Sequence, residues 1–213
     1  MATGTDVTKI KLALIDPTLS SFGKTLLTLS GHTGIITAIN FSYNDGLLVT
    51  GSRDNSAIIW GIDNTNKETY GKMIARLVGH TGFITDVCFS PDTSFVVTAG
   101  LVNHQPSSEW GAIIWKLDYK HGDYKAIKKL IHYNQVKAIK FSTDGKLLST
   151  LCKDNKGFIW DFDLNSENFG NLIVKLIKGN NDWIRKYSIK SRNTSAGIAP
   201  GMAIPLKKKV GVP

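Results

Sequence analysis

A pattern that repeats three times at fixed spacing constrains the fold of this chain more than any other feature. Each copy begins at a histidine, reaches a Phe-Ser pair nine residues later and a threonine nine residues after that phenylalanine, and closes on a tryptophan. The copies start at His32, His80 and His132. The step from threonine to tryptophan is ten residues in the first and third copies, and seventeen, from Thr98 to Trp115, in the second. The chain therefore repeats one structural unit, with seven residues inserted in the middle copy.

Each unit contains short β-rich runs separated by turn residues. The runs of the first unit cover residues 35–41, 47–51, 56–60 and 72–78. The inner runs are apolar on both sides of the strand, which is typical of sheets that are covered on both faces. A period of 48 residues between His32 and His80, with four strands in each unit, predicts the blade of a β-propeller.

The chain resembles the WD-repeat (Trp-Asp) β-propeller family through Gly31-His32, Gly79-His80 and Trp160-Asp161. The resemblance covers residues 9 to 189 and implies an all-β fold with about three complete four-stranded blades and partial blades at both ends. The expected complete blades are residues 35–78, 83–131 and 135–177, and the partial blades are 9–29 and 183–189. Since propellers have roughly four to eight blades, this one would be incomplete or unusually small.

The predicted ring could close in two ways. Trp183–Ile189 could join the strands of residues 9–29 as a degenerate fourth blade. Alternatively, self-association or a second chain could complete the propeller, because an open sheet edge invites pairing. Residues 190–213 lack the repeat and are expected to form a basic, irregular tail.

The resemblance also implies a hydrogen-bonded tetrad in each blade. Its members are the turn histidine, a hydroxyl on the second strand, an aspartate in the next turn and a tryptophan on the third strand. The matching residues are His32, Thr50, Asp54 and Trp60 in blade one, and His132, Thr150, Asp154 and Trp160 in blade three. Blade two has only His80, Thr98 and Trp115, because Val102 stands where the aspartate is expected, so its network is predicted to be incomplete.

Threonine, histidine and aspartate together also suggest a nucleophilic triad. A structural role is favoured because the set recurs in each blade, ends in a tryptophan and has no neighbouring oxyanion hole. His104 and His121 lack the spacing of metal ligands. No glycine-rich phosphate loop is followed by a helix. The sequence therefore predicts no enzyme, no metal site and no cofactor.

Functional residues are then expected on the edge where, in this family, the Gly-His turns and the turns between second and third strands open; we call this edge the rim. The insertion in blade two lies there and contains His104 and Trp110. Trp110 could anchor a partner, or it could fold back over the network of its own blade. Ile35, Phe83 and Trp183 occupy equivalent positions after their turns, and they could contact a partner or only pack the rim.

The net charge of +9 is concentrated at the C-terminus. Residues 178–213 contain eight basic residues and one acid, which gives +7 and leaves +2 for residues 1–177. Lys207, Lys208 and Lys209 are candidates for binding an anion such as RNA phosphate. The chain has no secretory signal, no apolar run as long as a membrane span and only two cysteines, so the cytosol or nucleus is the expected location.

These observations lead to two functional hypotheses. The first is a non-catalytic scaffold for protein–protein interactions within an intracellular complex, with one or more proteins as partners and no membrane contact. The alternative is an RNA- or ribosome-associated WD-repeat factor that uses its basic tail.

Overall fold

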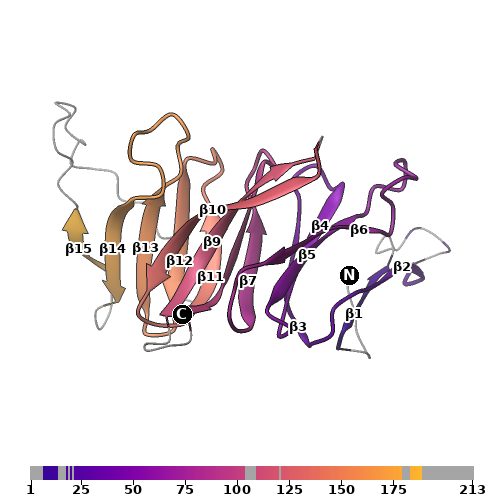
Figure 1. The fold of residues 1–213 in the computed structure, drawn as a ribbon, viewed down its shortest axis with the longest axis horizontal. Coiled ribbons are helices and arrows are strands. Elements are labelled where there is room, and N and C mark those ends of the chain that lie inside the picture. Colours follow the sequence, from indigo (N-terminus) through magenta and orange to yellow (C-terminus); the bar gives the residue numbers. More distant parts are fainter. Residues whose placement is uncertain are drawn as a thin grey trace, which may run out of the picture.

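The computed structural model describes residues 7–13, 18, 20, 22–103, 109–119, 121–178 and 183–188. Within these ranges the regular structure consists of fifteen β-strands arranged in four antiparallel sheets. The sheets follow one another along the long axis of the molecule, with β1 near one end and β15 at the other (Figure 1). None of the described residues belongs to a helix with the length and hydropathy to cross a membrane.

The sheets follow the predicted units closely. The first sheet pairs β1 (Lys9–Ala13) with β2 (Thr25–Ser30). Blade one contains β3 (Ile36–Phe41), β4 (Leu47–Ser52), β5 (Ser56–Gly61) and β6 (Met73–Val78). Blade two contains β7 (Ile84–Phe89), β8 (Phe95–Asn103), β9 (Glu109–Asp118) and β10 (Asp123–His132). Blade three contains β11 (Val136–Phe141), β12 (Leu147–Cys152), β13 (Lys156–Asp161) and β14 (Leu172–Lys178), with β15 (Trp183–Ser188) added beside β14.

The insertion in blade two lengthens its strands. β8 has nine residues and β9 has ten, whereas the corresponding β4 and β5 each have six. The register continues through Leu101↔Trp110 to Asn103↔Glu109. Trp110 therefore lies in a paired strand, and residues 104–108, which include His104, are outside the described part.

The prediction for Trp183–Ile189 is wrong. That segment was expected to begin a further blade, but β15 pairs antiparallel with β14, from Lys178↔Trp183 to Val174↔Ser188. The connection, Gly179-Asn180-Asn181-Asp182, has no histidine to tie it to a threonine of a following sheet. The outer edge of β14 offers unpaired backbone groups directly beside it. A fourth blade made from β15 and β1–β2 is also excluded, since these strands lie at opposite ends of the row (Figure 1).

The core consists of three apolar clusters, and each cluster is shared by two neighbouring sheets. The first joins β1–β2 to blade one through Ile10, Leu29, Leu48, Ile58 and Trp60. The second lies between blades one and two, and the third between blades two and three. Cys88 and Cys152 are buried free thiols in the third cluster. Burial raises the pKa of both thiols, so they pack as small apolar side chains.

Hydrogen bonds between first strands align the blades. The Thr37 hydroxyl donates to the Ile84 carbonyl at 2.6 Å, and the Thr85 hydroxyl donates in the same way to the Val136 carbonyl at 2.5 Å. A hydrogen bond also runs from blade two to blade one, where the Phe89 backbone N–H donates to Asn40 Oδ1 at 3.0 Å. Each blade is thus held to the next by its inner strand as well as by its core.

Candidate protein-interaction rim

The tetrad of blade one is a continuous hydrogen-bonded chain. Trp60 Nε1–H donates to Thr50 Oγ1 at 3.0 Å, and this hydroxyl lies 2.8 Å from His32 Nε2. His32 Nδ1 is 2.8 Å from Asp54 Oδ2. The carboxylate also accepts from the backbone N–H groups of Thr33 and Ser56 at 3.0 Å. The chain therefore ties two strands of the blade to the turn that precedes its first strand.

These contacts define the protonation state of the histidine. Because the Asp54 carboxylate can only accept, His32 Nδ1 carries the hydrogen and donates to it, and Nε2 of a neutral ring then accepts from the Thr50 hydroxyl. A neutral imidazole meets both requirements. Burial lowers the pKa of His32, although Asp54 opposes this change. Hydrogen bonds from Ser56, His32 and Thr33 outweigh burial at Asp54 and hold the pKa of that carboxyl well below its usual range.

In blade two a backbone carbonyl takes the place of the missing aspartate. His80 Nε2 lies 2.8 Å from Thr98 Oγ1, which also accepts from Trp115 Nε1 at 2.9 Å. The Leu101 carbonyl accepts from His80 Nδ1 at 3.3 Å and from the Thr81 amide at 2.8 Å. In blade one, Asp54 Oδ2 accepts both of the corresponding hydrogen bonds. The network was predicted to be incomplete; it lacks the carboxylate, but the histidine has both of its partners.

Blade three also departs from the prediction, because Asp154 does not bind His132. The inner part is the same, with Thr150 Oγ1 2.8 Å from His132 Nε2 and 3.0 Å from Trp160 Nε1. However, His132 Nδ1–H donates to the Leu130 carbonyl at 2.9 Å. Asp154 accepts instead from the Lys156 ammonium. Blade three therefore keeps three members of the tetrad, and its histidine is hydrogen-bonded to a backbone carbonyl instead of to the aspartate.

Two substitutions account for this difference. Gly34 lies so close to the Asp54 turn that an added Cβ would be 2.7 Å from Asp54 N, and blade three has Asn134 at this position. The turns of both blades keep the same backbone hydrogen bond, from Arg53 N to Ile35 O and from Lys153 N to Gln135 O at 2.8 Å, so the Cβ of Asn134 changes the approach only at that residue. In addition, Ser56, which donates to Asp54 Oδ1 at 2.6 Å, is replaced by Lys156, whose ammonium pairs with Asp154.

The glycine before the histidine also has a steric role. A Cβ on Gly31 would lie 2.8 Å from the Trp60 ring, and one on Gly79 would lie 2.9 Å from the Trp115 ring. Blade three has Ile131 at this position, and β10 continues as a paired strand through His132. His132 thus approaches the turn from an extended strand, where the carbonyl of Leu130 is within reach.

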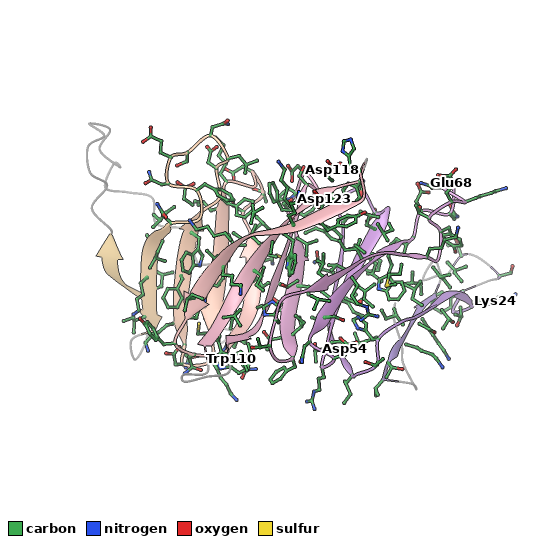
Figure 2. The ribbon with its side chains drawn as sticks, in the orientation of Figure 1. Lys24, Asp54, Glu68, Trp110, Asp118 and Asp123 are labelled. Atoms are coloured by element: carbon green, nitrogen blue, oxygen red, sulfur yellow. The ribbon has the colours of Figure 1, made fainter. Side chains whose placement is uncertain are left out.

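The rim carries a pair of partly exposed aromatic side chains. Trp110 and Asp54 lie along the same edge of the molecule, opposite the edge that carries Glu68, Asp118 and Asp123 (Figure 2). The Trp110 ring meets Phe83 edge to face, with 5.4 Å between centroids. Phe83 is 38% exposed and Trp110 is half-buried. Trp110 thus packs on the residue after the Gly-His turn, and the pair presents one apolar surface to solvent.

The comparison with known families agrees with this geometry. The family described as "WD domain, G-beta repeat" matches residues 23–61, 71–101 and 125–161, which together are half of the chain. The chain belongs to the WD-repeat family. Its repeats are of the kind that forms protein-interaction scaffolds. A search of curated proteins finds no match to this chain.

The WD-repeat hydroxyls are unsuited to nucleophilic catalysis. Thr50, Thr98 and Thr150 are at most 2% exposed, and each is held between a tryptophan and a histidine. A substrate could not reach them without opening a blade. Among the described residues, no three His, Cys, Asp or Glu side chains gather where they could hold a metal ion.

The remaining predicted rim residues are distributed as follows. Ile35 is 41% exposed beside the turn of blade one. The backbone of Trp183 belongs to β15, so it does not occupy a position equivalent to Phe83. His104, Lys207, Lys208 and Lys209 lie outside the described residues.

Tyr133 is a rim residue that the sequence analysis missed. It directly follows His132, at the position of Thr33 and Thr81 in the other turns, and its side chain is fully exposed. His132 pairs in register with Trp110, so the backbone of Tyr133 lies at the rim, directly after β10. An aromatic residue in a turn that elsewhere carries threonine was the available signal.

Proposed function

We propose that this WD-repeat protein is a non-catalytic scaffold within an intracellular complex, and that it binds a partner protein through the rim of blade two. The observation that carries the proposal is the Phe83–Trp110 pair, in which two large aromatic side chains stay partly exposed on a rigid framework. Aromatic anchors held on ordered elements contribute most of the energy of many interfaces, because they lose little entropy on binding.

The fold supports this role through the rigidity of the turns. His80 is hydrogen-bonded on both ring nitrogens, and the Thr81 amide is tied to Leu101. Phe83 follows directly after this turn, so its backbone is placed before any partner arrives. The first strands of the blades contribute alignment through their hydrogen bonds, while the rim provides recognition.

The test is a comparison of alanine variants in partner capture. Partners of the full chain would be crosslinked, identified by mass spectrometry and then titrated as purified proteins. Phe83→Ala and Trp110→Ala should each weaken binding by more than about 1 kcal/mol, which is at least about fivefold in Kd. Phe22→Ala is the matched control, because Phe22 is 58% exposed in the connection between β1 and β2. Binding that is unchanged in both rim variants would refute the proposal.

A second candidate function rests on the charge distribution. The +7 carried by residues 178–213 favours association with RNA through the C-terminal tail, including Lys207, Lys208 and Lys209. RNA affinity should then fall steeply with salt concentration, and removal of residues 190–213 should abolish it. Binding of RNA that persists after this removal would exclude the tail as the site.

A further inference from the structure

Charged side chains are divided between the two edges of the molecule. The edge opposite the rim, where Figure 2 labels Glu68, carries mainly acids in its turns. Those in the turns that join the first strand to the second, or the third to the fourth, include Asp45, Asp63, Asp92, Asp144 and Asp163. The described turns of the rim carry exposed charges of the opposite sign.

Two basic residues stand in rim turns on either side of blade two. Arg53 lies in the turn between β4 and β5, and Lys153 lies at the same place between β12 and β13. Both side chains are exposed, and neither has an ion pair within the described part of the chain. The carboxylates of the same two turns, Asp54 and Asp154, are already hydrogen-bonded within their own blades. The free charge of these turns is therefore positive.

A second row of basic residues lies on the outer strands, close to the rim. Arg76, Lys129 and Lys175 are paired with equivalent residues of the third strands, so one position carries a cation in all three blades. In blade one, the Arg76 guanidinium donates to the carbonyl of Gly31, directly before the turn histidine. In blade two, burial lowers the pKa of His80, and the charge of Lys129 adds to this effect. These cations thus approach the Gly-His turns from the outer side and strengthen the positive charge of the rim.

The aromatic pair of blade two lies between the two rim cations. Arg53 is on the blade-one side of Phe83, because β4 packs against the start of β7, where a Cβ on Gly51 would overlap Ile84 Cγ2. Lys153 is on the blade-three side, because its backbone is hydrogen-bonded to the start of β11, which lies beside β7. The rim therefore presents an apolar surface with a cation on each side.

We infer that the rim binds an acidic segment of the partner protein, with carboxylates beside Arg53 and Lys153 and an apolar side chain on the Phe83–Trp110 pair. The inference rests on the proposed function and adds the chemistry of the partner. Opposite charges around an apolar contact orient the partner and accelerate its association. No undescribed stretch of the sequence is itself such a segment, since each contains at most one aspartate or glutamate.

The geometry of the aromatic pair favours a protein segment over RNA. Single-stranded RNA is held by stacking of its bases on the open faces of aromatic rings. The rings of Phe83 and Trp110 meet at an interplanar angle of 74°, with the edge of one against the face of the other. The pair therefore offers no parallel platform for successive bases, whereas an apolar side chain can fill the angle between the two rings.

Selection of peptides from a random displayed library on the full-length protein tests the inference. The selected peptides should contain at least about threefold more aspartate and glutamate than the input library, next to an apolar residue. One of them, synthesised with a fluorescent label, would then be titrated by anisotropy against the wild-type protein and its variants. Raising the salt concentration from about 50 mM to about 200 mM should weaken its binding severalfold.

Charge reversal at the rim provides the decisive comparison. Arg53→Glu and Lys153→Glu should each weaken the peptide at least about fivefold, and Arg53→Gln and Lys153→Gln should weaken it less. Lys67→Glu is the matched control, because Lys67 is exposed in the turn between β5 and β6 at the opposite edge. It makes the same change of charge and should leave the affinity unchanged. Circular dichroism checks the fold of each variant.

Several outcomes would overturn the inference. A selection that yields no peptide, or acidic peptides that bind the charge-reversed rim variants equally well, would do so. Neutral peptides that require Phe83 and Trp110 would refute the inference alone and leave the proposed function standing. Peptides unaffected by Phe83→Ala and Trp110→Ala would refute both. An oligouridine that binds in place of any peptide, and that depends on Arg53 and Lys153, would assign the rim to RNA instead.

Discussion

Blades one and three share a repeat in sequence but hold their first turns differently. In blade one, the His32 ring is hydrogen-bonded to the carboxylate of Asp54, which lies in another turn and also accepts from the backbone amide of Thr33. In blade three, the His132 ring connects to the carbonyl of Leu130, two residues before it, and Asp154 pairs with Lys156. The inner half, tryptophan to threonine to histidine, is the same in both. The tryptophan, threonine and histidine thus have one geometry in both blades, whereas the second hydrogen-bond partner of the histidine can be replaced.

The largest expected effect tests the shared half. Trp60→Ala and Trp160→Ala should each lower the free energy of unfolding by about 3–5 kcal/mol, since each leaves a cavity and removes the indole donor from a buried hydroxyl. Urea denaturation measures both. Equal costs would fit the common geometry of the inner half. A Trp160→Ala cost below about 1 kcal/mol would show that blade three is not held by its triad.

The next effect is a loss of stability in acid. Burial lowers the pKa of His80 and His132 to about 4, from the ordinary value of 6.5 that applies in the unfolded chain. Their stabilising contribution is therefore complete above about pH 6.5 and is lost as the pH falls toward about 4, because only the unfolded chain takes up protons in this range. Each histidine contributes about 3 kcal/mol to this loss.

Histidine titrations followed by nuclear magnetic resonance sharpen the comparison. His32 lies beside the Asp54 carboxylate, which opposes the effect of burial, so it should titrate above His132. Unfolding midpoints that stay constant from about pH 7 to about pH 4 would contradict the assignment of neutral buried imidazoles.

The third prediction compares the two aspartates. Asp54→Ala should cost about 2–3 kcal/mol, because it leaves the buried His32 Nδ1 and the backbone amides of Thr33 and Ser56 without their acceptor. Asp154→Ala removes a half-exposed ion pair with Lys156 and should cost less than about 1 kcal/mol. Thermal melts of both variants measure the difference. Similar costs would mean that Asp154 has a structural role beyond this ion pair.

The smallest expected effect concerns the turn itself. Gly34→Ala should destabilise the protein by about 1–2 kcal/mol, because its Cβ would meet the backbone of the Asp54 turn at 2.7 Å. Asn134→Ala changes a position that already has a Cβ and removes only the hydrogen bond from Gln135 N to Asn134 Oδ1, so it should cost less than about 1 kcal/mol. If Gly34→Ala is neutral, the steric account of why Asp154 does not reach His132 is wrong.

Much of the fold could be predicted from the sequence because the residues that repeat are those whose side chains contact one another. The spacing of histidine, threonine and tryptophan located the strands, and the resemblance to the WD-repeat family implied the inner half of each network. The partner of His132 could not be predicted in this way, since backbone carbonyls such as that of Leu130 are present at every position and carry no signature. Asp154 matched the expected position, but its contact depended on the local geometry of its turn, where Asn134 and Lys156 replace Gly34 and Ser56.

The edges of the molecule were also hard to predict. The sequence of β15 suited a new inner strand and an added outer strand equally well, and the open edge of β14 decided between them. Trp110 was expected either to anchor a partner or to cover its own network. The pairing of β9 with β8 and β10 places its ring against Phe83, which the sequence pattern did not show. Ile39 and Phe41 are 40% and 46% exposed in the described structure, where β1–β2 packs on Leu48, Ile58 and Trp60, and no local pattern in the sequence shows this.

The sharing of each apolar cluster between neighbouring sheets has a consequence for cooperativity. Since no blade has a core of its own, the smallest unit that can unfold independently is the interface between two neighbouring sheets and not a sequence repeat. Blades one and two each take part in two clusters, so their amides should exchange hydrogen most slowly, and opening should spread inward from both ends. A cut between Val78 and Ile84 would divide the second cluster, and each fragment would then expose half of a core that only the other fragment can cover.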